Sequence, residues 1–330
     1  MLDPPEVGKR SLVRLGPDSM LGARRIVVCV GPIRSGTTWL FEWLRQHPQV
    51  AAPRGKEINF FNDNFDRGTD WYLRQFFAGF AQATRLLDVG PHYLDLPDIA
   101  ERLAQTIVDP LIIVGIRNPY DRVISDYRRH HSGIARLTDL ITHPAGWQHY
   151  LRTNLIAKSI ETLFVKFGRE NVIVYNFDEL TQSPRTLCEK LCTAIDIVPL
   201  APSGIERKVL ASQAPHSRRL LNLARVCRRL AAGVAPRLAD DLAFGPLRRL
   251  VYSDQPAGTI SAQEMKAAFN RCRPFFEAEI TALEALLGID LANWRLAADF
   301  DGKRWPAAKP RENFGPRTRA APPRPLSTRA

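Results

Sequence analysis

A short apolar run followed at once by a glycine-rich loop constrains the fold of this chain more than any other feature. The run "RRIVVCV" at 24–30 is continuous and rich in β-branched residues, as expected of a strand buried on both faces of a parallel sheet. The loop "GPIRSGTTWL" at 31–40 leads into apolar residues at helical spacing, and "HP" at 47–48 ends that helix. A strand, a glycine-rich turn and a helix in this order form a phosphate-site unit, because the helix N-terminus points free N–H groups at an anion.

The loop departs from an ordinary P-loop at its cation. A P-loop reads G-x-x-x-x-G-K-[ST], with a lysine directly after the second glycine. Here Gly31 and Gly36 keep the spacing and Thr38 holds the Ser/Thr position, but Thr37 takes the place of the lysine. The cation, Arg34, comes two residues before the second glycine instead. The loop therefore predicts a phosphate site with an altered charge arrangement.

Short apolar runs alternate with helical stretches along the first half of the chain. Alternation of this kind predicts an α/β fold, a single P-loop-like domain with a central, roughly five-stranded parallel sheet flanked by helices. After the first strand, further strands are predicted at 83–90, 111–117 and 171–177, and helices at 97–107, 119–131 and 147–168.

The pattern turns helical after about residue 178. Helices are predicted at 183–195, in an Arg-rich segment at 217–232, and at 261–287, where Gly288 suits the residue that follows a helix. We expect an extended lead-in over 1–23, a catalytic domain over 24–301, and a disordered tail rich in Pro and Arg over 302–330.

Composition limits the class of protein. The chain has 330 residues, 45% of them apolar, and a net charge of +12 carried largely by arginine, which suits contacts to phosphate, sulfate or carboxylate. A solvated basic surface explains much of that charge equally well, and a basic balance alone does not indicate nucleic acid.

Cysteine usage and hydropathy bear on location. The five cysteines are scattered and odd in number, which argues against a disulfide framework or a zinc site and favours a reducing compartment. No apolar run approaches the ~20 residues of a membrane span, and residues 1–24 lack the apolar core of a signal peptide. We therefore expect a soluble, cytoplasmic protein.

A second candidate anion site follows a later strand. In "GIRNPYDRVISDYRRH" at 115–130, Asn118 suits a helix cap and Pro119 the first helical position. Arg117 ends the preceding strand, and Ser125 lies about two helical turns further along. Two phosphate-binding units on one sheet indicate a ligand with two separated phosphates.

Three motifs now stand in order along the chain: "PIRSGTTWL" at 32–40, "KEINFFNDNFDRGTDWY" at 56–72 and "RNPYDRVISDY" at 117–127. The first resembles the 5′-phosphosulfate loop of sulfotransferases that use 3′-phosphoadenosine 5′-phosphosulfate (PAPS). The third resembles their 3′-phosphate element, R-N-P-x-x-R-x-x-S-x-Y, and the second is similar to the K-E-x-x-F-F segment of heparan-sulfate sulfotransferases. The resemblance covers about residues 24–195.

The resemblance implies that the chain transfers a sulfonate from PAPS, without a metal, to a hydroxyl or amine of a carbohydrate, lipid or small molecule. The acceptor and the oligomeric state stay open, and no specific nucleic acid is expected. Arginine holds its proton more tightly than the lysine usual in the family, so Arg34 is expected to stabilise charge on the leaving phosphate. The implied cofactor-binding residues are Arg34, Ser35, Gly36, Thr37, Thr38, Arg117, Ser125 and Arg218. Arg218 is taken from a later basic group that also contains Arg207, Lys208 and Arg219.

The resemblance also implies a catalytic base. Glu57 stands where heparan-type relatives place a catalytic glutamate, and partial desolvation beside Phe60 and Phe61 suits a general base near neutrality. A salt bridge with Lys56 is the structural alternative for Glu57, and His92 is the rival base. Heparan-type relatives carry a second lysine where this chain has a valine, at 89.

Two other functions stay open at this stage. A P-loop kinase for a small molecule would need a carboxylate for Mg²⁺ at a strand end, and Asp88 is the candidate. A non-enzymatic nucleic-acid-binding protein would use the Arg-rich segment over 207–229 and the tail, but leaves the paired motifs unexplained.

Overall fold

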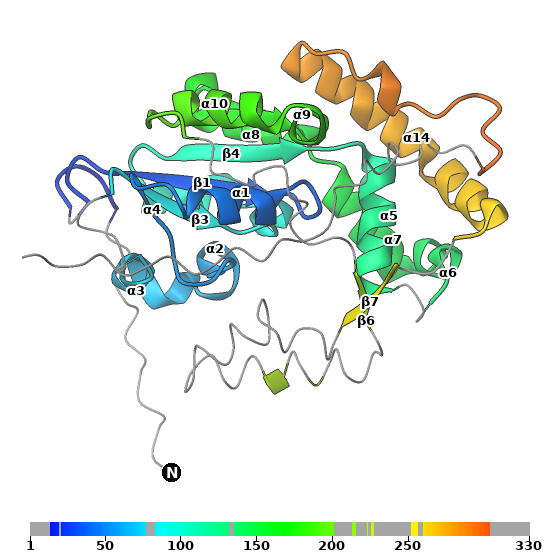
Figure 1. Ribbon diagram of the computed structural model, residues 1–330, viewed down its shortest axis with the longest axis horizontal. Coiled ribbons are helices and arrows are strands. Elements are labelled where there is room, and N and C mark those ends of the chain that lie inside the picture. The colour runs from blue at the N-terminus through cyan, green and yellow to red at the C-terminus, as the bar shows by residue number, and fades with distance from the viewer. Residues whose placement is uncertain are drawn as a thin grey trace, which may run out of the picture.

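A five-stranded parallel sheet forms the centre of the protein (Figure 1). The computed structural model describes residues 14–19, 21–76, 83–131, 135–200, 213–215, 223, 226–227, 252–256 and 260–303. The sheet order is β2-β3-β1-β4-β5. The strands are β1 Arg25–Gly31, β2 Val50–Ala51, β3 Arg85–Val89, β4 Leu111–Ile116 and β5 Val172–Asn176.

The predicted α/β fold is confirmed, and four of these strands lie where the sequence places them. The fifth, β2, was not predicted at any position, because two residues carry no periodicity. It pairs with the start of β3 through Val50 and Ala51. Its position at the sheet edge leads the chain directly into the segment that contains Glu57.

Helices cover both faces of the sheet, and β1 shows why. Its alternate residues Ile26, Val28 and Val30 belong to one buried cluster, whereas Val27 and Cys29 belong to another. The first cluster is shared with α2, α3, α4, α5, α8 and α14, and the second with α1 and α10. A strand buried on both faces has no need for polar residues, so it reads as the continuous apolar run of the sequence.

The described helices have the following bounds. They are α1 Thr37–Leu44, α2 Phe60–Asp63, α3 Gly68–Arg74, α4 Ile99–Thr106, α5 Pro119–His130, α6 Leu137–Thr142, α7 Pro144–Asn154, α8 Ala157–Phe167, α9 Phe177–Gln182, α10 Pro184–Ala194 and α14 Ala262–Leu287. A separate antiparallel pair joins β6 Gln213–Pro215 to β7 Tyr252–Pro256. Within the part of the chain that the structure describes, no helix has the length and apolarity needed to cross a membrane.

The single helix predicted over 147–168 is wrong. The structure has two helices there, with a break between Asn154 and Ala157. The carboxylate of Glu279, a buried residue of α14, accepts hydrogen bonds from the backbone N–H groups of Ile156 at 2.8 Å and Ala157 at 2.7 Å. A partner far away in sequence thus satisfies the N-terminus of α8, which local periodicity does not reveal.

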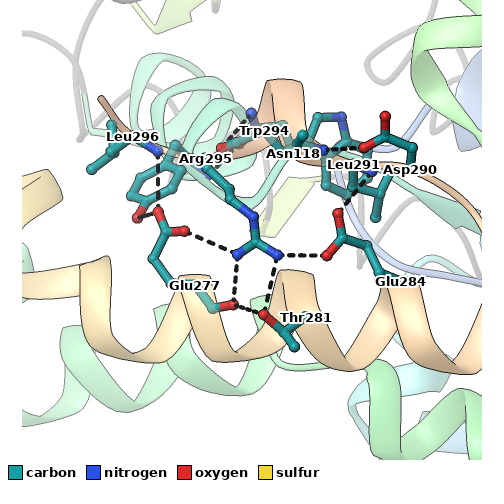
Figure 2. A network of polar contacts seen from close by, with 11 residues as sticks. Asn118, Glu277, Thr281, Glu284, Asp290, Leu291, Trp294, Arg295 and Leu296 are labelled. Carbon is teal, nitrogen blue, oxygen red and sulfur yellow. Dashed lines mark hydrogen bonds and ion pairs between the residues drawn. The ribbon is translucent and has the colours of Figure 1, made fainter. Parts of the chain in front are cut away.

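Helix α14 and the segment after it fold back onto the sheet domain. Gly288 follows α14 in the left-handed conformation, with φ of 67°, as predicted for this helix end. Figure 2 shows Arg295 between Glu277 and Glu284 of α14, with which it forms ion pairs. These contacts hold the segment around the 3₁₀ turn η4, Ala292–Trp294, against the helix.

Several predictions lie outside the described residues. They include most of the Arg-rich helix at 217–232, almost all of the tail after residue 302, and the basic group of Arg207, Lys208, Arg218 and Arg219. Part of the predicted lead-in is described. There the backbone N–H of Leu15 donates to the carbonyl of Thr106 at 2.7 Å, and the side chains of Leu15 and Leu21 are buried.

Candidate active site

The glycine-rich loop connects β1 to α1 as predicted, and its conformation depends on Gly36. This residue precedes α1 with φ of 92°, in the left-handed region that favours glycine. A Cβ there would lie 2.8 Å from Leu180 and 3.3 Å from Phe177, so a larger residue also lacks space. The loop therefore leads directly into α1, whose first N–H groups have no partner within the helix and are suited to binding an anion.

The loop and the second candidate anion element are in direct contact. The Nε of Arg34 donates a hydrogen bond to the Oγ of Ser125 at 2.9 Å. Arg117 donates from Nη1 to the backbone carbonyl of Arg34 at 2.8 Å. β1 and β4 are neighbours in the sheet, so their carboxyl ends bring three predicted residues from two motifs together.

Asn118, the N-cap residue of α5, fixes the start of this helix next to Arg117. Its side chain accepts a hydrogen bond from the N–H of Tyr120 at 3.0 Å, with Pro119 at the first helical position. The cap and the proline match the sequence prediction. The Asn118 amide also donates to the carbonyl of Trp294 at 3.2 Å (Figure 2), so the C-terminal segment supports the start of α5.

Buried donors near the loop fit an anionic ligand. Ser35 is fully buried, and its Oγ has no hydrogen-bond partner among the described residues. The same is true of the Nε of Arg117, where burial lowers the pKa of the guanidinium. Buried polar groups without partners are costly, and a bound anion would satisfy these donors.

Residues of strand β5 and helix α9 contact the loop and Arg117. The hydroxyl of Tyr175 donates to the carbonyl of Ser35 at 2.7 Å, and the Arg117 guanidinium lies 4.1 Å from the centre of the Phe177 ring. Sequence reasoning gave neither aromatic residue a place in the site. The signal was present in the apolar strand over 171–177, because the end of β5 adjoins the end of β4.

Lys56 and Glu57 form an ion pair beside the start of α1. The Lys56 ammonium is buried, with its Nζ 2.7 Å from the Glu57 carboxylate and 3.4 Å from the Thr37 hydroxyl. The salt bridge considered as the structural alternative for Glu57 is therefore present. It does not remove Glu57 from the site, because the same ammonium reaches the first residue of α1.

The backbone around Glu57 is held in an uncommon conformation. Glu57 has φ of 69°, and its N–H donates to the carbonyl of Val89 at 3.2 Å. Arg34 also lies in the left-handed region, with φ of 64°. Non-glycine residues there are uncommon and are concentrated at functional sites, where the surrounding structure maintains them.

His92, the rival base, lies on a turn beyond β3. Its Nδ1 is 2.9 Å from Asp95, and that hydrogen bond raises the pKa of His92, against the opposing effect of burial. The charge of Glu57 contributes to the same rise, so the two base candidates influence each other. Asp95 thus engages the imidazole of His92 at Nδ1.

Asp88, the carboxylate required by the kinase hypothesis, lies inside the core. Its Oδ2 accepts hydrogen bonds from the hydroxyls of Tyr72 and Tyr93, each at 3.1 Å. It is fully buried, and burial raises its pKa to about 7. Asp88 is therefore a buried carboxyl engaged by two tyrosine hydroxyls.

Comparison with known proteins identifies the family. A family model described as "Sulfotransferase domain" matches residues 24–200. Heparan sulfate glucosamine 3-O-sulfotransferase 6 of Mus musculus is 36% identical over 108 residues, and the membrane-associated sulfotransferase kil1 of Dictyostelium discoideum is 32% identical over 102 residues. The matches cover 32% and 30% of this chain, but only 31% and 22% of those proteins.

A solved structure agrees over most of the chain. The sulfotransferase from Alicyclobacillus acidocaldarius superimposes with a TM-score of 0.54, covering 83% of this chain and 100% of its own, at 20% identity. That likeness shows a shared fold. Together with the match of the family model, which spans more than half of the chain, it leads to one conclusion: this chain belongs to the sulfotransferase family.

Proposed function

We propose that the protein transfers a sulfonate group from PAPS to a hydroxyl or amine of an acceptor. One observation carries the proposal: the hydrogen bonds that link Arg34 to Ser125 and Arg117 join two anion-binding elements at neighbouring strand ends. A nucleotide with phosphate groups at both its 3′ and 5′ positions is a ligand of matching chemistry. Membership of a family that uses PAPS supports the same donor.

The two elements would hold opposite ends of the donor. The N–H groups of Gly36, Thr37 and Thr38, with Ser35, face the 5′-phosphosulfate in this proposal, because a helix N-terminus favours anions. Arg117 and Ser125 hold the 3′-phosphate. Arg34, which contacts both of those residues, stabilises the negative charge on the bridging oxygen of the phosphosulfate.

The transfer is an in-line displacement at sulfur. The acceptor oxygen or nitrogen forms a bond to sulfur while the bond from sulfur to the bridging oxygen breaks, releasing adenosine 3′,5′-bisphosphate. Glu57 takes the acceptor proton as this occurs. Arg34 keeps its proton and supplies only charge, because a guanidinium is not deprotonated in proteins.

We propose a carbohydrate as the acceptor class. Support comes from the similarity to relatives named heparan sulfate glucosamine 3-O-sulfotransferases, and the net charge of +12 suits an anionic glycan. We propose a cytoplasmic location on separate grounds. All five cysteines are free thiols, as a reducing compartment would keep them.

A transfer assay tests the function. PAPS with labelled sulfonate is incubated with the full chain and a panel of glycans, lipids and small alcohols. Labelled product is expected with at least one glycan, and calorimetry should detect binding of adenosine 3′,5′-bisphosphate. Absence of bisphosphate binding would refute the proposal. ATP turnover that depends on magnesium would also refute it and would favour the kinase hypothesis.

A further inference from the structure

Lys56 stands where a second positive charge can reach the phosphosulfate. Its side chain extends from the segment after β2 to Thr37, the residue that takes the lysine position of an ordinary P-loop. Only 7% of Lys56 is exposed to solvent, so its ammonium is largely removed from water. Through its contact with Thr37, it adjoins the N-terminus of α1.

The contacts of this ammonium are incomplete. A lysine ammonium has three donors. Among the described residues, Glu57 takes one at 2.7 Å, and the contact with Thr37 is long, at 3.4 Å. A buried ammonium with one strong partner is costly unless a further anion approaches it. The cradle at the start of α1 is where such an anion is expected.

We propose that Lys56 is a further catalytic residue, whose ammonium is held by Glu57 in the free enzyme and is shared with the sulfonate of the bound donor. The inference rests on the proposed function, since the sulfonate is the group that draws Lys56 away. Lys56, on the segment between β2 and α2, thus supplies the positive charge that a P-loop lysine would carry at the position of Thr37.

Sharing Lys56 affects both reactants. The ammonium stabilises negative charge on the sulfonate oxygens as the transfer proceeds. Glu57 loses part of its counter-charge at the same time, and a carboxylate without a close cation is a better proton acceptor. Donor binding would thus prepare the base, whereas the free enzyme keeps it paired.

The test compares two ligands that differ by the sulfonate. Calorimetry measures the affinities of PAPS and of adenosine 3′,5′-bisphosphate for the full-length wild type, Lys56→Met, Lys56→Arg, Glu57→Gln and the double variant Lys56→Met with Glu57→Gln. Lys166→Met is the control, because Lys166 forms an exposed ion pair with Glu101 at 2.8 Å on another part of the surface. Thermal unfolding verifies that each variant folds.

Lys56→Met should weaken PAPS binding about 10-fold and leave bisphosphate binding unchanged, because a hydrogen bond to a charged group is lost only with the sulfonated ligand. Lys56→Arg should retain most of the affinity. Glu57→Gln should strengthen PAPS binding, since it releases Lys56, and the double variant should lose that gain.

Two results would overturn the inference while leaving the proposed function intact. One is equal affinity of Lys56→Met and wild type for PAPS, with normal bisphosphate binding in both. The other is a Glu57→Gln variant that binds PAPS no more tightly than the double variant does. If the wild type binds neither ligand, the proposed function itself is wrong, and the inference falls with it. If Lys56→Met does not fold, the comparison of Glu57→Gln with wild type decides.

Discussion

At the scale of single residues, two charged side chains of the candidate site lie on strained backbone. Arg34 and Glu57 have φ values of 64° and 69°. Positive φ costs a non-glycine residue about 1–3 kcal/mol, and it persists where packing and hydrogen bonds enforce it. The N–H of Glu57 is fixed on Val89 and the carbonyl of Arg34 on Arg117. The positions of both side chains are thereby set before a ligand arrives.

Glu57→Gln tests the base at this scale. A glutamine keeps the shape of the side chain but does not accept a proton, so turnover should fall by ~10²–10⁴, the usual contribution of an acid–base group. Binding of adenosine 3′,5′-bisphosphate should stay unchanged. Steady-state sulfonate transfer measures the first quantity and calorimetry the second.

Glu101→Gln is the matched control for this variant, since Glu101 is an exposed carboxylate whose partner is Lys166. Normal turnover in Glu57→Gln would remove Glu57 from the role of base. His92 would then be the next residue to replace.

The sequence motifs predict the charged residues of the candidate site better than the contacts that position them. Arg34, Arg117 and Ser125 were expected on one ligand because their motifs end neighbouring strands, and the structure brings them into contact. The sequence presents Lys56 only as a partner of Glu57. Its approach to Thr37 depends on the path of the chain after β2, which no local pattern encodes.

At the scale of elements, long-range contacts account for the differences between prediction and structure. Strand β2 forms only by pairing with β3, and the start of α8 is fixed by Glu279 of α14. Boundaries determined by a local cap were predicted well. The start of α5 at Asn118 and the end of α14 at Gly288 are examples.

Asn118→Ala tests the position of α5. The variant loses the cap on the N–H of Tyr120 and the contact with the carbonyl of Trp294. The free energy of unfolding should fall by about 1–2 kcal/mol, as for other lost caps. Affinity for adenosine 3′,5′-bisphosphate should fall as well, since Asn118 directly follows Arg117. Urea denaturation and calorimetry measure the two effects.

Ser261→Ala provides the control for a lost cap. The Ser261 hydroxyl accepts from the N–H of Glu264 at 3.2 Å at the start of α14. This variant should lose stability without losing ligand affinity. If Asn118→Ala behaves in the same way, α5 is capped for stability alone.

At the scale of the whole molecule, the buried carboxyl of Asp88 makes folding depend on pH. Burial raises its pKa from 3.8 to about 7 in the folded protein. Between about pH 4 and 7 the folded state therefore holds a proton that the unfolded chain releases. This contribution favours folding at low pH and is lost as the pH rises through the folded pKa.

Asp88→Asn removes this titration. Relative to the variant, the wild type should lose stability steadily between about pH 4 and 7, and the difference should level off above that range. Urea denaturation at a series of pH values measures it. Asp98→Asn, which alters an exposed carboxylate paired with Arg102, is the control. A difference between wild type and Asp88→Asn that is constant with pH would contradict the expectation.

Trp294 has a consequence for how this protein can be divided. It is buried, its carbonyl accepts from Asn118, and its indole Nε1 donates to Asp178 at 2.9 Å. Trp294 lies beyond residue 200, where the family match ends. A fragment cut at that boundary would uncover apolar surface and leave the Asn118 amide and the Asp178 carboxylate without these partners. Chimeras that exchange segments between relatives should therefore carry the C-terminal segment along with the half that the family model matches.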